Sequence, residues 1–271
     1  MKDRMTLGQY YQADSVLHRM DPRVKLTGTI IYIAALFLAK DLWGYLLATV
    51  FLIAVIALSK VPVRFMLKGM RSIAFLIILT VVFNLFMTPG EEILRFWKLH
   101  ITREGLILAV SMAVRLTYLI VGSNIMTLTT TPNNLTDGME SLLSPLKVLH
   151  APVHEVAMMM SIALRFIPIL MEETDKIMKA QMARGASFDE GNLIERAKSM
   201  VPLLVPLFVS AFRRAGDLAL AMEARGYRGG DNRTRMKPLH YAGRDYAGYA
   251  VLAALLAAAI VLRTVSIPLP F

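Results

Sequence analysis

Residues 105–128 read GLILAVSMAVRLTYLIVGSNIMTL, and this stretch decides the fold because it carries a single charged residue, Arg115. A helix needs roughly 17–25 consecutive, mostly apolar residues to cross a membrane. The whole sequence is 56% hydrophobic and 18% charged, with a mean hydropathy of +0.52. A soluble domain has about 45–50% apolar and about 25% charged residues. We therefore predict an all-α integral membrane protein.

Four more segments on either side of this stretch approach the length and apolarity of a transmembrane helix. They are residues 26–39, 42–58, 72–88 and 246–262. With 105–128 they make about five predicted transmembrane helices. Arg115 would lie about 15 Å along its helix, because each residue adds about 1.5 Å. A charge at that depth either contacts a substrate or partner or is bonded to backbone carbonyls and polar residues such as Asn84 and Asn124.

The loops between these helices differ in charge. Residues 1–25 carry five basic and three acidic residues, 59–71 carry four basic residues and no acid, and 89–104 balance three against three. Because positively charged loops stay in the cytoplasm, we predict that the N-terminus and 59–71 are cytoplasmic and that 89–104 is external. The net charge of +10 then reflects topology and contact with membrane lipid, and we expect no nucleic-acid partner.

Residues 129–245 are unusual because this long stretch carries fifteen basic and thirteen acidic residues. Thr131 followed by Pro132 is a typical helix start, an N-cap with proline at the first helical position. We predict a cytoplasmic module of about three helices, at 132–143, from near 151 to 184, and from about 193 to 225. The predicted domains are 1–128 with four transmembrane helices, 129–245, and 246–271 with the final transmembrane helix and an external C-terminus.

The tripeptide Ala-Arg-Gly occurs twice in this module. Its copies are Ala183-Arg184-Gly185 and Ala224-Arg225-Gly226, and the second arginine follows the first by 41 residues. A helix that ends at glycine has unpaired carbonyls and a negative dipole end, which stabilise an arginine in the last turn. The planar guanidinium still has donors to offer a partner. Two such ends predict two equivalent contact sites on partner proteins.

Two apolar runs in the module, 156–171 and 200–212, invite an alternative. Pro168 and Arg165 interrupt the first run, and the second is too short for a span, so we expect buried or interfacial helices. A membrane hairpin made of both runs remains open, and it would place the two Ala-Arg-Gly motifs on opposite sides of the membrane.

Methionine is frequent in the module, and such flexible apolar side chains either fill a core or form a surface that accepts differently shaped partners. The predicted apolar partner surface consists of Met158, Met159, Met160, Leu170, Met171, Ile177, Met178 and Met182.

Several kinds of chemistry are absent from the sequence. No Gly-x-x-x-x-Gly-Lys-[Ser/Thr] loop is present, so we expect no nucleotide hydrolysis by that route. His154-Glu155 begins like a zinc-protease helix, but Met158 stands where the second histidine belongs. There is no cysteine. We expect neither a catalytic residue nor a metal or other cofactor bound by this chain.

Taken together, the sequence resembles the transmembrane T component of energy-coupling factor (ECF) transporters, a bacterial and archaeal branch of the ATP-binding cassette importers. The resemblance covers nearly the whole chain. Its residues are Gly8-Gln9-Tyr10-Tyr11, the segment Asp14-Ser15-Val16-Leu17-His18-Arg19-Met20-Asp21-Pro22-Arg23-Val24-Lys25-Leu26, Thr129-Thr130-Thr131-Pro132, Arg165-Phe166-Ile167-Pro168 and both Ala-Arg-Gly motifs.

This resemblance implies that Arg184 and Arg225 insert into grooves on two ATPase subunits, identical or different, which bind the ATP and Mg²⁺. It further implies that an apolar helix surface holds one exchangeable substrate-binding S component for uptake of a vitamin or micronutrient across a bacterial or archaeal cell membrane. The N-terminal segment is most similar to the shared type of T component. A T component dedicated to cobalt, nickel or biotin is one alternative. Alternatives of another class are a self-sufficient permease that uses Arg115 and a membrane-embedded enzyme that uses Asn133, Asn134 and Asp137.

Overall fold

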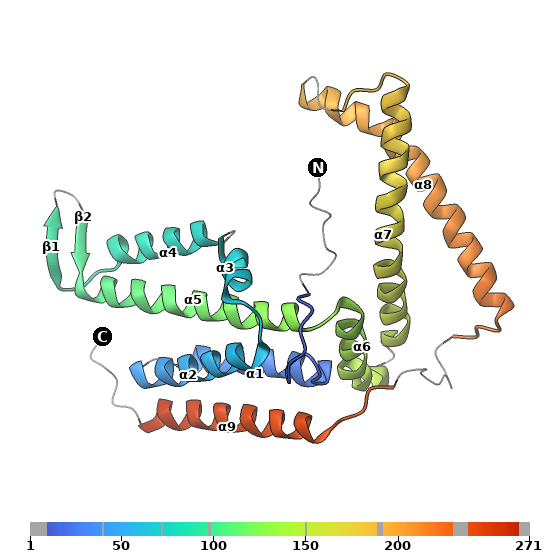
Figure 1. Cartoon of the computed structure of the whole chain (residues 1–271). Coiled ribbons are helices and arrows are strands. Elements are labelled where there is room, and N and C mark those ends of the chain that lie inside the picture. Colours follow the sequence, from blue (N-terminus) through green and yellow to red (C-terminus); the bar gives the residue numbers. More distant parts are fainter. Residues whose placement is uncertain are drawn as a thin grey trace. The chain divides into compact units, whose positions relative to one another are not determined.

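The computed structural model is dominated by helices, and it divides into two compact units (Figure 1). The first unit comprises residues 1–141 and 238–271, and the second comprises residues 142–237. The structure describes residues 10–39, 41–71, 73–96, 99–149, 151–188, 192–229 and 238–265.

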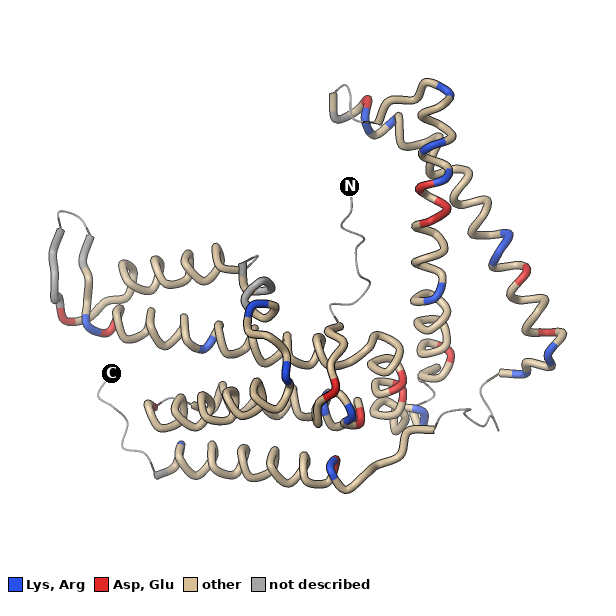
Figure 2. The backbone as a smooth tube through the Cα atoms, viewed as in Figure 1, with Lys and Arg blue, Asp and Glu red and all other residues tan. Residues whose placement is uncertain are grey.

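The first unit is a bundle of apolar helices. These are α1 (Pro22–Leu38), α2 (Leu42–Ser59), α4 (Ala74–Met87), α5 (Arg103–Thr129) and α9 (Gly243–Val265). Helix α1 packs against α9, α5 and α2, while α4 packs along α5. Figure 2 shows that the middle of these helices is largely free of charged residues. The bundle buries a core that includes Tyr32, Leu36, Leu52, Ile125 and Leu255.

Four described helices are long and apolar enough to cross a membrane, namely α2, α5, α9 and, in the second unit, α7. Helix α4 is apolar but shorter, with 14 residues. Helix α1 begins at Pro22 rather than near residue 26, because the Asp21 side chain accepts a hydrogen bond from the Arg23 N–H and caps the helix. The predicted all-α membrane fold is confirmed, and the number of helices that cross stays a prediction.

Two elements of the first unit were not expected from the sequence. The predicted loop 59–71 contains helix α3 (Val63–Arg71), and Met66 of this helix is buried. The predicted loop 89–104 contains an antiparallel hairpin of β1 (Glu92–Phe96) and β2 (Leu99–Thr102), in which Phe96 pairs with Leu99. Both elements shorten the irregular connections between the apolar helices.

Helix α6 (Pro132–Leu143) follows α5 and begins at the proline that the sequence indicated. It leads into the second unit, which consists of the 3₁₀ helix η1 (Ser144–Leu149), α7 (Val153–Ala183) and α8 (Leu193–Ala224). The bounds of α6, α7 and α8 confirm the three helices predicted for this part of the chain.

Helices α7 and α8 pack against each other in antiparallel fashion. The side chain of Gln181 donates a hydrogen bond to the Pro202 carbonyl at 3.3 Å, and Arg214 forms an ion pair with Glu173 at 3.1 Å. Figure 1 shows the two helices crossing near the C-terminal end of α7 and diverging toward the N-terminal end of α7 and the C-terminal end of α8. The unit is therefore a pair of long helices whose C-terminal ends point in different directions.

Candidate functional site

The first Ala-Arg-Gly motif forms the C-terminal cap of α7. Gly185 has a φ of +90°, a left-handed conformation that favours glycine. The Ala186 N–H donates to the Gln181 carbonyl at 3.0 Å, and the Gly185 N–H donates to the Met182 carbonyl at 3.0 Å. This pair of hydrogen bonds is a Schellman motif. It fixes Arg184 as the residue at the helix cap.

The second motif repeats this geometry at the end of α8. Gly226 has a φ of +73°. The Tyr227 N–H donates to the Met222 carbonyl at 3.0 Å, and the Gly226 N–H donates to the Glu223 carbonyl at 2.9 Å. Arg225 thus occupies the same cap position as Arg184. The prediction that both helices end at these glycines is confirmed.

The two arginines lie far apart on the α7–α8 pair. Gln181, three residues before Arg184, contacts α8 at Pro202, and Arg225 lies 23 residues beyond that point. At about 1.5 Å per residue, the rest of α8 is about 35 Å long. Both arginines are exposed, and neither side chain makes a hydrogen bond or ion pair with another residue that the structure describes. The two motifs are therefore two separate exposed helix caps.

The left-handed glycines allow a test of these caps. We expect Gly226→Ala to weaken the end of α8 by about 1 kcal/mol, because a Cβ disfavours positive φ. Hydrogen exchange of a peptide covering 222–227 should then be about fivefold faster. Gly216→Ala is the matched control on the same helix, because a Cβ there meets open space and alanine favours a helix. Equal exchange in the two variants would show that Gly226 is not required for the cap.

The predicted apolar surface of α7 is only partly exposed. Met159, Met160, Met171 and Met182 are exposed, whereas Met158, Leu170, Ile177 and Met178 are half-buried. Leu170 lines a groove of about 250 Å³ between α7 and α8, together with Ile162 and Phe166 of α7 and residues of α8 such as Ala215 and Met222. Four of the eight predicted residues are therefore exposed on α7, and of the four half-buried ones Leu170 lines the groove with α8.

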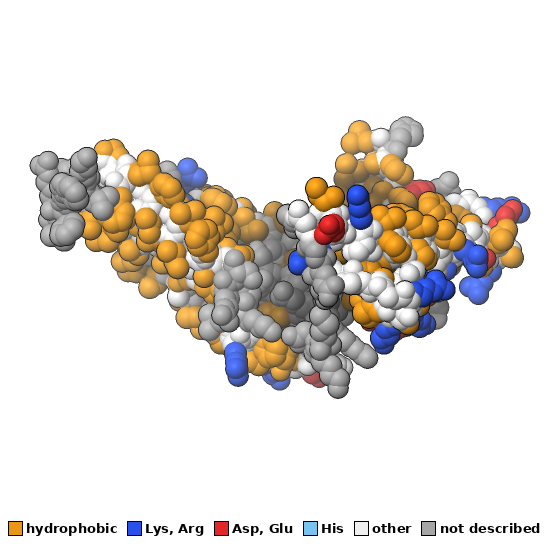
Figure 3. All heavy atoms as spheres, turned by 90° about the horizontal axis from the view of Figure 1, so that it is seen from above, with side chains coloured by type: hydrophobic (Ala, Val, Ile, Leu, Met, Phe, Trp, Pro, Cys, Tyr) orange, Lys and Arg blue, Asp and Glu red, His pale blue; other side chains and the backbone are white. Residues whose placement is uncertain are grey.

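Helix α8 carries an apolar stripe that the sequence analysis did not identify. The stripe consists of the exposed residues Val201, Leu204, Val205, Phe208, Val209 and Phe212. Their spacing alternates three and one residues, which places them on one helix face. Figure 3 shows hydrophobic side chains over α7 and α8 as well as over the first unit. The spacing was visible in the run 200–212, which was judged from its length and from Pro202 and Pro206 rather than from its periodicity.

Arg115 is bonded to the backbone of the first unit. Its guanidinium donates to the Ala39 carbonyl at 2.9 Å, and its centre lies 5.8 Å from the ring centroids of Phe37 and Tyr45. Ala39 follows the last residue of α1, where carbonyls lack helical partners. A cation is favourable at that end of a helix. These contacts favour the structural interpretation, although the bond goes to Ala39 rather than to Asn84 or Asn124.

The segment before α1 is held by side-chain contacts. The His18 Nε2 donates to the Tyr11 carbonyl at 2.9 Å, so Nδ1 accepts from the Ser15 hydroxyl at 2.7 Å. Arg19 forms an ion pair with Asp14. The hydrogen bond from Arg19 lowers the pKa of the Asp14 carboxyl below its ordinary value. The quoted residues Gly8 and Gln9 lie outside the described residues.

A buried carboxylate joins the N-terminal ends of α1 and α9. Asp245 is 1% exposed, and it accepts hydrogen bonds from the Asp21 N–H and the Ala242 N–H, each at 2.8 Å. Arg23 pairs with Asp21 at 2.9 Å and donates to the Leu239 carbonyl at 3.1 Å. These contacts fix the chain where it enters α1 and α9. The sequence analysis did not identify this cluster.

The residues named for a membrane-embedded enzyme, Asn133, Asn134 and Asp137, all lie in α6. Asn133 and Asn134 are exposed at the start of α6. Within the described ranges, no three side chains of histidine, aspartate or glutamate come close enough to hold a metal ion.

Comparison with known proteins places this architecture in a family. The family model described as "CbiQ: Cobalt transport protein" matches residues 13–236. The energy-coupling factor transporter transmembrane protein EcfT of Thermosediminibacter oceani is 53% identical over 259 residues, which cover 96% of this chain and 98% of the relative.

Two further relatives carry the same name. The EcfT of Clostridium kluyveri is 54% identical over 244 residues, which cover 89% of this chain and 90% of that protein. The EcfT of Bacillus subtilis is 49% identical over 260 residues, which cover 94% of this chain and 98% of that protein. The match therefore includes both helix caps and the apolar bundle, and the chain belongs to the EcfT family of transmembrane components of energy-coupling factor transporters.

Proposed function

We propose that this chain couples ATP hydrolysis in two partner ATPases to substrate release by an S component. The observation that carries the proposal is the pair of equivalent helix ends, each of which presents an exposed arginine at a Schellman cap. Two long helices that cross and then diverge are suited to moving their two C-terminal ends in a coordinated way. The chain itself is the non-catalytic subunit.

The two arginines are the proposed contacts with the ATPases. A guanidinium presented at a helix end favours bidentate contacts with carboxylates, so acidic grooves are the expected partner sites. The distance of about 35 Å along α8 supports one ATPase for each arginine. ATP and Mg²⁺ are bound in the ATPases, because this sequence lacks a phosphate-binding loop of its own.

The exposed apolar residues of α7 and α8 are the proposed surface for the S component. Met159, Met160 and Met171 supply flexible contacts on α7, and the α8 stripe adds the aromatic anchors Phe208 and Phe212. Such a surface suits several S components in turn. Specificity for a vitamin or other micronutrient then lies in the S component. The whole complex is located in the plasma membrane of the cell.

The direct test is assembly. Co-expressed with its ATPases and one S component, the chain should purify as a complex with two ATPase subunits, one S component and one copy of this chain. The complex should take up the substrate in proteoliposomes only with internal ATP. Substrate uptake by this chain alone would overturn the proposal.

Membrane orientation is tested by cysteine labelling, since the sequence has no cysteine. We expect Glu91→Cys to react with an impermeant external thiol reagent and Ser187→Cys to be protected in intact cells, because the positive-inside rule places 59–71 and the α7–α8 unit in the cytoplasm. Position 189, equally suitable by sequence, lies outside the described residues.

The control for labelling is permeabilisation, after which both cysteines should react because both positions are exposed. External labelling of Ser187→Cys in intact cells would favour a span formed by α7, whose length and composition also permit a crossing.

A further inference from the structure

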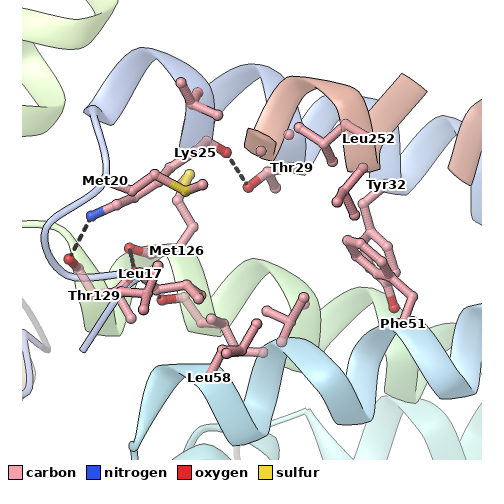
Figure 4. A pocket seen from close by; sticks show the side chains of 18 of the residues that line it. Leu17, Met20, Lys25, Thr29, Tyr32, Phe51, Leu58, Met126, Thr129 and Leu252 are labelled. Atoms are coloured by element: carbon pink, nitrogen blue, oxygen red, sulfur yellow. Dashed lines mark hydrogen bonds between the residues drawn. The ribbon is translucent and has the colours of Figure 1, made fainter. Parts of the chain in front are cut away.

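The first unit contains an apolar cavity that the coupling function does not use. Its volume is about 310 Å³, which is at the lower end of small-molecule sites. It lies among α1, α2, α5, α9 and the segment before α1. Figure 4 shows Leu17, Met20 and Met126 at one end of it and Tyr32 and Phe51 at the other. The lining is apolar over most of its length.

Part of the cavity lining is continuous with the outer surface of the bundle. Leu58 of α2 and Val251 of α9 line the cavity and are also 51% and 55% exposed. On membrane helices, exposed apolar residues face lipid chains. The cavity is therefore accessible to a hydrocarbon chain from the bilayer.

The other notable feature is positive charge at one end. The Lys25 amine donates to the Thr129 carbonyl at 2.9 Å and to the His18 carbonyl at 3.4 Å, and Arg244 lines the same cavity. Figure 4 shows the amine beside Thr129 at the Leu17 end. An ammonium group has three donors, so one remains for a ligand.

The acidic groups near Lys25 are already engaged. Asp21 precedes α1, which contains Lys25, and Asp245 follows Arg244 in the first turn of α9, where it accepts a hydrogen bond from the Asp21 N–H. The Asp21 carboxylate pairs with Arg23, and both Asp245 oxygens accept backbone N–H groups. Among the residues that the structure describes, the end of the cavity thus holds two cations and no carboxylate that is free to bind both. A bound anion would pair with Lys25 and Arg244.

We infer that this cavity binds one acyl chain of an anionic phospholipid, whose phosphate lies at the Lys25 and Arg244 end. The predicted topology agrees, because it places this end of the helices at the cytoplasmic face. There the anionic inner leaflet and basic side chains attract each other. The phospholipid is held by the bundle and is separate from the helix ends that contact ATPases.

The test uses the purified complex in nanodiscs of phosphatidylcholine. These carry a trace of either phosphatidylglycerol or phosphatidylcholine with a photoreactive diazirine in one acyl chain. We expect peptides that line the cavity to be labelled on the order of tenfold more by the phosphatidylglycerol probe, since two cations lie near its headgroup. Equal labelling by the two probes would overturn the inference.

Two pairs of variants separate the acyl chain from the headgroup. Val55→Trp fills the cavity and should abolish the labelling, whereas Val50→Trp changes an exposed position of the same helix that does not line the cavity. Lys25→Gln should remove most of the preference for phosphatidylglycerol, whereas Arg64→Gln on α3 should leave it intact. Unchanged labelling in Val55→Trp would also overturn the inference.

A competition measurement needs no variant. In the wild-type complex, excess unlabelled phosphatidylglycerol should displace the probe and excess phosphatidylcholine should not. If an apolar segment of a neighbouring protein filled the cavity instead, neither lipid would compete, and the inference would fail. Because labelling does not depend on ATP, its failure leaves the proposed coupling function untouched.

Discussion

Replacing both arginines at the helix ends, Arg184→Glu together with Arg225→Glu, is expected to abolish the association of this chain with its ATPases. Each arginine is exposed at a helix cap and available to an acidic groove. A glutamate in its place removes the attraction and adds repulsion between like charges. It also places a negative charge at the negative end of the helix dipole.

The expected loss of ATPase binding is large because a buried charged contact is lost at each helix end. Removing one partner of such a pair costs about 2–5 kcal/mol, so each single variant should weaken ATPase binding by roughly 30-fold or more. About 35 Å of α8 separates Arg225 from the point where the end of α7 contacts α8. The two ends are therefore too far apart to share contacts, and their effects should add. Pull-down of the ATPases measures their binding to this chain. ATP-dependent substrate uptake in proteoliposomes measures transport.

The control makes the same two Arg→Glu changes at positions outside the helix caps. Arg165 and Arg213 are exposed on α7 and α8 but lie away from both helix ends. Arg165→Glu with Arg213→Glu should leave most of the ATPase binding intact. Full uptake by the double cap variant would refute the proposed role of the two arginines, and equal loss in the control would assign the effect to net charge.

The helix ends could be predicted from the sequence because local chemistry decides them. A glycine after the last apolar turn supplies the left-handed conformation of a Schellman cap, and this held at Gly185 and Gly226. Likewise, Thr131-Pro132 marked the start of α6. The same signal was present at Asp21-Pro22, where it would have placed the start of α1 correctly.

Other features depend on contacts that no local pattern contains. The loop at 59–71 was judged by its charge, so the burial of Met66, which makes α3 part of the bundle, was not foreseen. The exposure of the α8 stripe depends on which face of α8 meets α7. The Asp21 N–H and the Asp245 carboxylate are 224 residues apart, and only the packing of α1 on α9 brings them together.

This long-range contact leads to the second large expected effect, because Asp245→Asn should destabilise the bundle strongly. The Asp245 carboxylate accepts from the Ala242 N–H just before α9 and from the Asp21 N–H just before α1. It therefore lies at the positive end of two helix dipoles. An asparagine keeps the shape but offers one acceptor, and its amide group opposes the other N–H donor.

Hydrogen bonds to a buried charged group contribute about 1.5–3 kcal/mol each, and an unsatisfied buried donor costs a similar amount. We therefore expect Asp245→Asn to lower stability by about 3 kcal/mol, which corresponds to a thermal midpoint lower by about 6–12 °C for a protein of this size. Unfolding of the purified chain in detergent, followed by intrinsic fluorescence, measures this change.

The matched control is Asp14→Asn, which makes the same chemical change at an exposed ion pair with Arg19, where both side chains are more than half exposed. Solvent screens such pairs, so the midpoint should hardly move. If Asp245→Asn and Asp14→Asn unfolded at the same temperature, the carboxylate between α1 and α9 would not stabilise the bundle. If the thermal midpoint of Asp245→Asn were instead several degrees below that of Asp14→Asn, Asp245 would be the residue that fixes the positions at which α1 and α9 begin.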